Sequence, residues 1–104
     1  MGQVAVVAKL TAAEGKTEEL KAVIADLVSA VRDGEPDTLV YATAQDGEDP
    51  AVFWFYELYG SPESAAAHAG GSALAEAGGR MAGLLGGRPE IHRMTPVAAK
   101  GLPG

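Results

Sequence analysis

The chain is 104 residues long with a mass of 10.6 kDa, a size that allows one domain. Acidic residues outnumber basic ones by 14 to 8, the formal net charge is −6, and the basic residues form no cluster. Proteins that bind nucleic acid or anionic membranes need such a cluster, so we expect neither partner. The lack of cysteine excludes disulfides and thiolate chemistry and fits the reducing cytoplasm, where we expect the protein. No signal peptide is visible, and no apolar run approaches the roughly 20 residues of a membrane span, so we expect a soluble protein.

The first half of the chain predicts a strand, a long helix and a second strand. Residues 3–10 are a short β-branched apolar run, which is typical of a strand. Apolar residues then recur at helical spacing over residues 17–33, with Thr17 as the expected N-cap and two glutamates in the first turn. A glycine and a proline end this helix. Residues 38–45 then alternate in the manner of a second strand.

The second half predicts two strands and a helix that glycines break in two. Asp46-Gly47 begins a turn, and Ser61 followed by Pro62 has the form of a capped helix start. The predicted elements are a strand over residues 51–59, helices over 61–69 and 72–85, and a strand over 90–97.

The element order is β-α-β-β-α-β. This order predicts an α+β fold of the ferredoxin-like split βαβ type, with one four-stranded antiparallel sheet and helices on one face. We expect a single domain over residues 1–97 and a C-terminal tail over residues 98–104.

Both faces of the predicted third strand are apolar. One face carries Phe53, Phe55, Glu57 and Tyr59, and the other carries Val52, Trp54, Tyr56 and Leu58. A half-exposed antiparallel strand alternates apolar with polar residues, and helices cover only one face of such a sheet. We therefore expect a second copy of the chain to cover the other face, giving a homodimer.

Three stretches of the sequence resemble one family. Residues 34–41 (GEPDTLVY) look like a Glu-Pro-Gly turn that leads into a second strand, and residues 56–64 (YELYGSPES) with Ala67-His68 look like a strand-Glu, aromatic, Ser, Glu and helix-His pattern. Met94-Thr95-Pro96 is similar to endings in the polyketide-quinone branch. In this order and spacing the motifs resemble the antibiotic biosynthesis monooxygenase superfamily over nearly the whole chain.

The resemblance implies a dimeric α+β barrel with a pocket in each subunit between the sheet and the helices. Members include cofactor-independent oxygenases of electron-rich phenols, anthrones and quinols, while others degrade haem or process signalling molecules. This chain has Asp37 for the usual glycine, and Phe55 and Tyr59 where the quinone-forming branch has an Asn and a Trp. It has no Asn at all, and neither histidine lies late in the second helix, so we do not expect haem degradation.

A cofactor-free oxygenase needs a base, a hydrogen-bond donor to an oxyanion and a dry pocket. His68 is the natural base, with a surface or capping histidine as the alternative. Tyr59 is the preferred donor over Tyr41 and Tyr56, because it occupies the family's aromatic position. Glu57 is either an acid or base with a raised pKa or half of a cross-subunit ion pair. The expected substrate-binding residues are Phe53, Trp54, Phe55, Glu57 and Met81.

The sequence thus leads to a hypothesis with two alternatives. The hypothesis is a cofactor-independent monooxygenase that oxidises a small aromatic phenol-, anthrone- or quinol-like compound. The alternatives are a dimeric ligand-binding or accessory domain without catalysis, and an isomerase or cyclase that uses the same pocket without oxygen. We expect no cofactor, since no glycine loop follows a strand into a helix start in the manner of a nucleotide cradle. We expect no metal, because His68 and His92 lie on separate elements without metal-ligand spacing.

Overall fold

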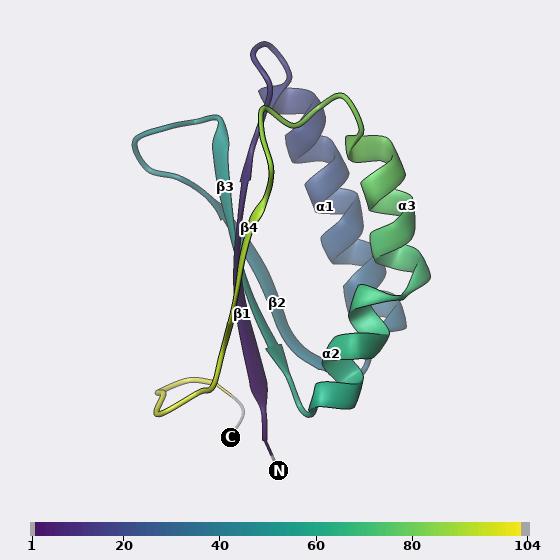
Figure 1. Ribbon diagram of the computed structural model, residues 1–104, viewed down its shortest axis with the longest axis vertical. Coiled ribbons are helices and arrows are strands. Elements are labelled where there is room, and N and C mark those ends of the chain that lie inside the picture. The colour runs from purple at the N-terminus through teal and green to yellow at the C-terminus, as the bar shows by residue number, and fades with distance from the viewer. Residues whose placement is uncertain (1, 103–104) are drawn as a thin grey trace.

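The computed structural model describes residues 2–102, which form a four-stranded sheet with three helices on one face (Figure 1). The strands are β1 (Val4–Thr11), β2 (Thr38–Gln45), β3 (Val52–Tyr59) and β4 (Glu90–Met94), and the helices are α1 (Thr17–Gly34), α2 (Pro62–Ala69) and α3 (Ser72–Met81). The strand order is β2-β3-β1-β4, and each pair of neighbours is antiparallel. The predicted ferredoxin-like α+β fold is confirmed. No helix among the described residues is long and apolar enough to cross a bilayer.

The three helices begin where local sequence signals place them, with one exception. Ser61 accepts a hydrogen bond from the Ser64 backbone N–H, and the Ser64 side chain returns one to the Ser61 N–H, so α2 starts with a full capping box. The predicted cap at Thr17 is wrong, because Thr17 is already the first residue of α1 and Lys16 precedes it without a side-chain cap bond. The predicted apolar stripe of α1 does face the core: its buried residues are Leu20, Val23, Ile24, Leu27 and Val31.

Helix α3 ends at Met81, four residues before its predicted end. Gly83 has a positive φ of 83°, a conformation that stops a helix and that glycine adopts without strain. The chain then docks against the end of β1, where the Gly86 N–H donates to the Thr11 carbonyl. A Cβ at Gly86 would lie 2.8 Å from the Ala12 carbonyl oxygen, so this close approach requires glycine.

The last strand is also shorter than predicted. β4 ends at Met94, which pairs with Ala5, and β1 itself begins only one residue earlier, at Val4. Residues 95–97 therefore have almost no strand left to pair with, and Pro96 has no N–H to donate to a ladder.

The two faces of the sheet have different surroundings. The helix-facing side holds the main core, in which Phe53 and Phe55 pack with α1 and α3 side chains. The opposite side, which we call the open face, carries no helix in the described structure (Figure 1). Trp54 and Met94 lie on the open face and remain 38% and 42% exposed. Exposed apolar side chains on this face agree with the apolar character that the sequence predicts for it.

A candidate acid–base site between the sheet and the helices

A pocket of about 470 Å³ lies between the helix-facing side of the sheet and helices α2 and α3. Its space arises from small side chains: Val6 and Ala8 form the floor on β1, and Gly78 and Gly83 line the opposite wall. Larger side chains from the neighbouring strands surround this floor. Those that line the pocket are Tyr41 on β2, Phe55, Glu57 and Tyr59 on β3, and Ile91 and Arg93 on β4.

His68 is held at one end of this pocket by partners from the α1–β2 turn and from strands β2 and β3. Its side chain is only 6% exposed, and its Nδ1 lies 2.7 Å from Oε1 of Glu35, the residue that follows α1. The same carboxylate oxygen accepts a hydrogen bond from the Thr38 hydroxyl at 3.0 Å. The imidazole ring also packs against Tyr41 and Tyr59, with ring centroids 4.9 and 5.6 Å away. These contacts fix both the position and the rotation of the ring.

The pairing with Glu35 determines which nitrogen of His68 can react. A neutral imidazole that donates its Nδ1 proton to a carboxylate has a free electron pair on Nε2. Nε2 makes no hydrogen bond to residues 2–102. Every fully buried polar side-chain atom in these residues has a partner, so Nε2, which has none, is not fully buried. Nε2 is therefore open to the surrounding space and can accept a proton from a bound molecule.

Glu57 and Tyr59 form a second buried polar pair in the same pocket. The Tyr59 hydroxyl donates to Glu57 Oε1 at 2.5 Å, and both residues are almost fully buried. Burial raises the pKa of Glu57, although the hydrogen bond from Tyr59, and the positive charge of His68 whenever that ring is protonated, act in the opposite direction. Burial and the neighbouring Glu57 raise the pKa of Tyr59, so its hydroxyl keeps its proton. Because Glu57 faces the helices, the expected ion pair across a sheet-to-sheet dimer does not fit its position.

Tyr41 supplies a phenol group that the protein leaves available. It pairs with Glu57 across the β2–β3 ladder, and burial raises its pKa, with Glu57 and Glu35 adding to the effect. Within residues 2–102 its hydroxyl has no hydrogen-bond partner, and the residue lines the pocket. The Tyr59 hydroxyl, in contrast, already donates its proton in the hydrogen bond to Glu57. Tyr41 is thus the better placed donor for a ligand.

The pocket brings together five of the seven site residues predicted from the sequence: His68, Tyr59, Phe55, Glu57 and Met81. The other two do not line it. Phe53 is packed into the core beyond the pocket, at 3% exposure. Trp54 lies on the open face, because consecutive strand residues point to opposite sides, and its indole N–H donates to Asp46 Oδ1 at 2.8 Å. Neither residue can contact a molecule bound beside His68.

The sequence-based prediction does not include Glu35 among the site residues, and it prefers Tyr59 to Tyr41 as the hydrogen-bond donor. Glu35 belongs to the Glu-Pro turn already noted in the sequence, so a signal for it existed. The departure from that turn pattern at Asp37 has no structural cost, since no non-glycine residue in the described chain has a positive φ. Within residues 2–102, no three His, Asp or Glu side chains lie close enough together to hold a metal ion.

The fold and the pocket together define a small α+β domain with a His68–Glu35 pair beside a largely apolar pocket. The sequence model of one family, described as antibiotic biosynthesis monooxygenase, matches residues 3–79. The match covers well over half of the chain, and the protein therefore belongs to the antibiotic biosynthesis monooxygenase family.

Solved structures agree with this assignment. A candidate antibiotic biosynthesis monooxygenase from Caulobacter crescentus is 31% identical, with a TM-score of 0.87 over 93% of this chain and 92% of that one. Another from Chloroflexus aurantiacus is 28% identical, with a TM-score of 0.80 over 97% and 99% of the two chains. A protein of unknown function from Nitrosomonas europaea is 26% identical, with a TM-score of 0.81 over 100% and 97%. No curated protein matches this chain.

Proposed function

We propose that the protein is a cofactor-independent monooxygenase that oxidises a small aromatic phenol-, anthrone- or quinol-like compound. The observation that carries the proposal is the His68–Glu35 pair: His68 lines the largely apolar pocket, and its Nε2 has no hydrogen-bond partner in residues 2–102. A positioned base beside apolar side chains that bind the ring is what such chemistry requires. The lack of cysteine is consistent with action in the reducing cytoplasm.

In this mechanism His68 removes an acidic proton from the substrate, and the resulting anion transfers an electron to dioxygen. For an anthrone, the methylene carbon loses two hydrogens and gains one oxygen atom, and the second oxygen atom leaves as water. Tyr41 would donate a hydrogen bond to the developing oxyanion, and Tyr59 would hold Glu57 in place. Glu35 also borders a second hollow of about 450 Å³, through which the proton taken by His68 can return to solvent.

Oxygen uptake tests this proposal. Purified protein is mixed with a panel of anthrones and naphthoquinols, oxygen consumption is followed with an electrode, and the products are identified by mass spectrometry. We expect at least one substrate to consume one molecule of dioxygen per quinone formed, faster than its own autoxidation. Binding of the panel without added uptake would contradict the oxygenase and support a ligand-binding domain, whereas anaerobic rearrangement would support an isomerase.

A homodimer formed through the open face is part of the same proposal. It is supported by the exposed apolar side chains there, Trp54 and Met94, on a sheet whose other side is covered by the helices. We expect sedimentation at micromolar concentration to report a species of twice the chain mass. Trp54→Glu combined with Met94→Glu should shift it toward the monomer, while Ala66→Glu on the exposed surface of α2 should not. A wild-type monomer under these conditions would contradict the proposal.

A further inference from the structure

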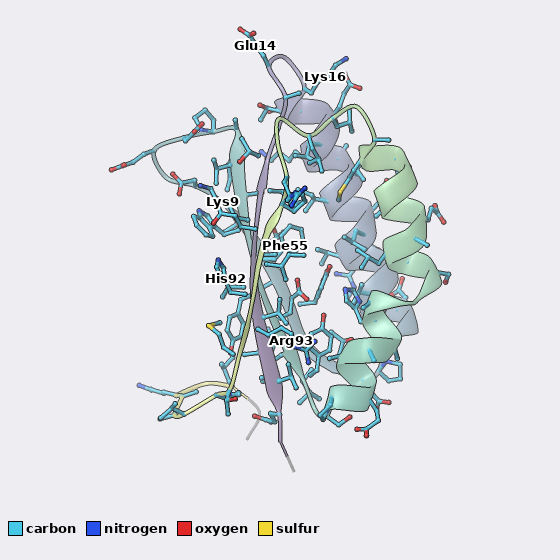
Figure 2. All side chains as sticks on the ribbon, viewed as in Figure 1. Lys9, Glu14, Lys16, Phe55, His92 and Arg93 are labelled. Atoms are coloured by element: carbon cyan, nitrogen blue, oxygen red, sulfur yellow. The ribbon has the colours of Figure 1, made fainter. Side chains whose placement is uncertain are left out.

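Arg93 lies on the pocket side of β4, outside the residues that the family model matches. Strand alternation separates it from its neighbours: Ile91 and Arg93 face the helices, whereas His92 faces the open side. Figure 2 shows this division, with Phe55 and Arg93 on the helix side of the sheet and Lys9 and His92 on the other. Among the side chains that line the pocket, Arg93 is the one permanent cation.

The ladder pairings place Arg93 in a row of residues that crosses the whole sheet. Arg93 pairs with Val6, Val6 pairs with Glu57, and Glu57 pairs with Tyr41. Neighbouring strands lie about 4.8 Å apart, so the backbone of Arg93 is roughly 10 Å from that of Glu57. Only the small apolar Val6 stands between them in the row. The pocket therefore has a polar end at His68, Glu57 and Tyr41, an apolar middle and a cationic end.

The charge of Arg93 is not neutralised by a protein partner. No carboxylate in residues 2–102 forms an ion pair with it, although the chain carries six more acidic than basic residues. Four other basic side chains, Lys9, Lys16, Arg32 and Arg80, do have such a partner. The guanidinium of Arg93 is free to bind an anion from solution.

We propose that Arg93 binds a carboxylate on the substrate, so that the pocket selects aromatic carboxylates and orients the opposite end of the ring toward His68. This inference rests on the proposed function only for the chemistry at His68. A planar guanidinium with parallel N–H groups matches a carboxylate in two hydrogen bonds. The reverse orientation is disfavoured, because it would bring the carboxylate against the acidic side chains of Glu57 and Glu35.

A matched pair of ligands tests the proposal by binding alone. 1-Naphthoate and 1-naphthamide have nearly the same shape and differ in charge, and their dissociation constants are measured by calorimetry at pH 7. We expect the wild type to bind 1-naphthoate at least about tenfold more tightly than 1-naphthamide, as hydrogen bonds to charged groups are about twice as strong as neutral ones. Arg93→Gln should remove this preference, and Arg93→Lys should keep part of it. Arg32→Gln, a change at the exposed end of α1, should leave it intact.

Each outcome has a definite meaning. Equal affinity of the wild type for both ligands, no measurable binding of either, or an equal loss of both in Arg93→Gln would overturn the proposal. Circular dichroism checks that the variants fold, which is expected because Arg93 is exposed. The result is independent of oxygen uptake: selective binding with no oxidation of the substrate panel would keep this inference and reject the oxygenase, and oxidation without selectivity would do the reverse.

Discussion

Replacing His68 by glutamine is expected to lower the rate of oxygen uptake by about two to four orders of magnitude, since a positioned general base contributes that much to a proton-transfer step. Glutamine is close to histidine in size, and its amide can still donate a hydrogen bond to Glu35, so the pocket should keep its shape. The measurement is kcat for the substrate that the wild type oxidises fastest. We expect KM to change little, because the apolar walls that bind the ring are untouched.

His92→Gln is the matched control. His92 is the only other histidine of the chain, lies on the open face of β4 and has a side chain that is 66% exposed. Its replacement should leave oxygen uptake unchanged. A His68→Gln variant that keeps a third or more of the wild-type rate would contradict the assignment of His68 as the base. It would not contradict the proposed oxygenase activity.

Glu35→Gln separates positioning from proton transfer. Glu35 does not need to touch the substrate, because its carboxylate acts through Nδ1 of His68. A glutamine can still accept the Nδ1 proton in a hydrogen bond but lacks the charge that stabilises the imidazolium formed during the reaction. We expect a loss of rate smaller than that of His68→Gln and carried by kcat rather than KM. A purely structural role would instead lower the fraction of folded protein without changing kcat per folded molecule.

Features encoded over short distances in the sequence could be predicted. The apolar stripe of α1 and the Ser61 capping box follow from residues a few positions apart, and both are present. The placement of His68 on the helix after β3 followed from the same signals. The end of α3 was predicted poorly, because the left-handed turn at Gly83 depends on how residues 84–86 dock against β1.

The contacts among the site residues could not be predicted, because they join segments that are distant in the sequence. Glu35 reaches His68 across 33 positions of sequence, and Tyr41 becomes a neighbour of Glu57 only through the β2–β3 register. A one-residue slip of that register would send Tyr41 to the opposite face. The apolar character of both faces of β3 also hid which face lines the pocket, which is why Trp54 was included with the substrate-binding residues.

Tyr59→Phe is expected to lower the free energy of unfolding at neutral pH by about 1–3 kcal/mol, the usual cost of leaving a buried polar group without its partner. The phenyl ring keeps its place in the core, since Tyr59 is 1% exposed, so the change isolates the hydroxyl. The group left unsatisfied is the carboxyl of Glu57. Urea unfolding at a fixed protein concentration measures the effect, because dimerisation would make stability depend on concentration.

The cost of this substitution should grow as the pH rises. Burial raises the pKa of Glu57, so the folded protein binds its proton more tightly than the unfolded chain does. The associated stability is present below the ordinary pKa of a glutamate and is lost as the pH rises through the higher folded value. The hydrogen bond from Tyr59 lowers the pKa of Glu57 in the folded protein, so its removal raises that pKa further. The other ionisable groups around the pocket are His68, Glu35, Tyr41 and Arg93. Tyr59→Phe should therefore cost little near pH 4 and its full amount near pH 7.

A second background makes the origin of this pH dependence visible. In Glu57→Gln the side chain at position 57 does not titrate, but its amide oxygen can still accept the Tyr59 hydroxyl. Adding Tyr59→Phe to Glu57→Gln should cost the same free energy of unfolding at pH 4 and pH 7, and less at pH 7 than it costs in the wild type. The difference between the two backgrounds is the coupling between a phenol donor and a buried carboxylate. If Tyr59→Phe has the same cost at both pH values in both backgrounds, Glu57 is not ionised in the folded protein at neutral pH, and its carboxyl would reach a substrate as a proton donor instead of as a base.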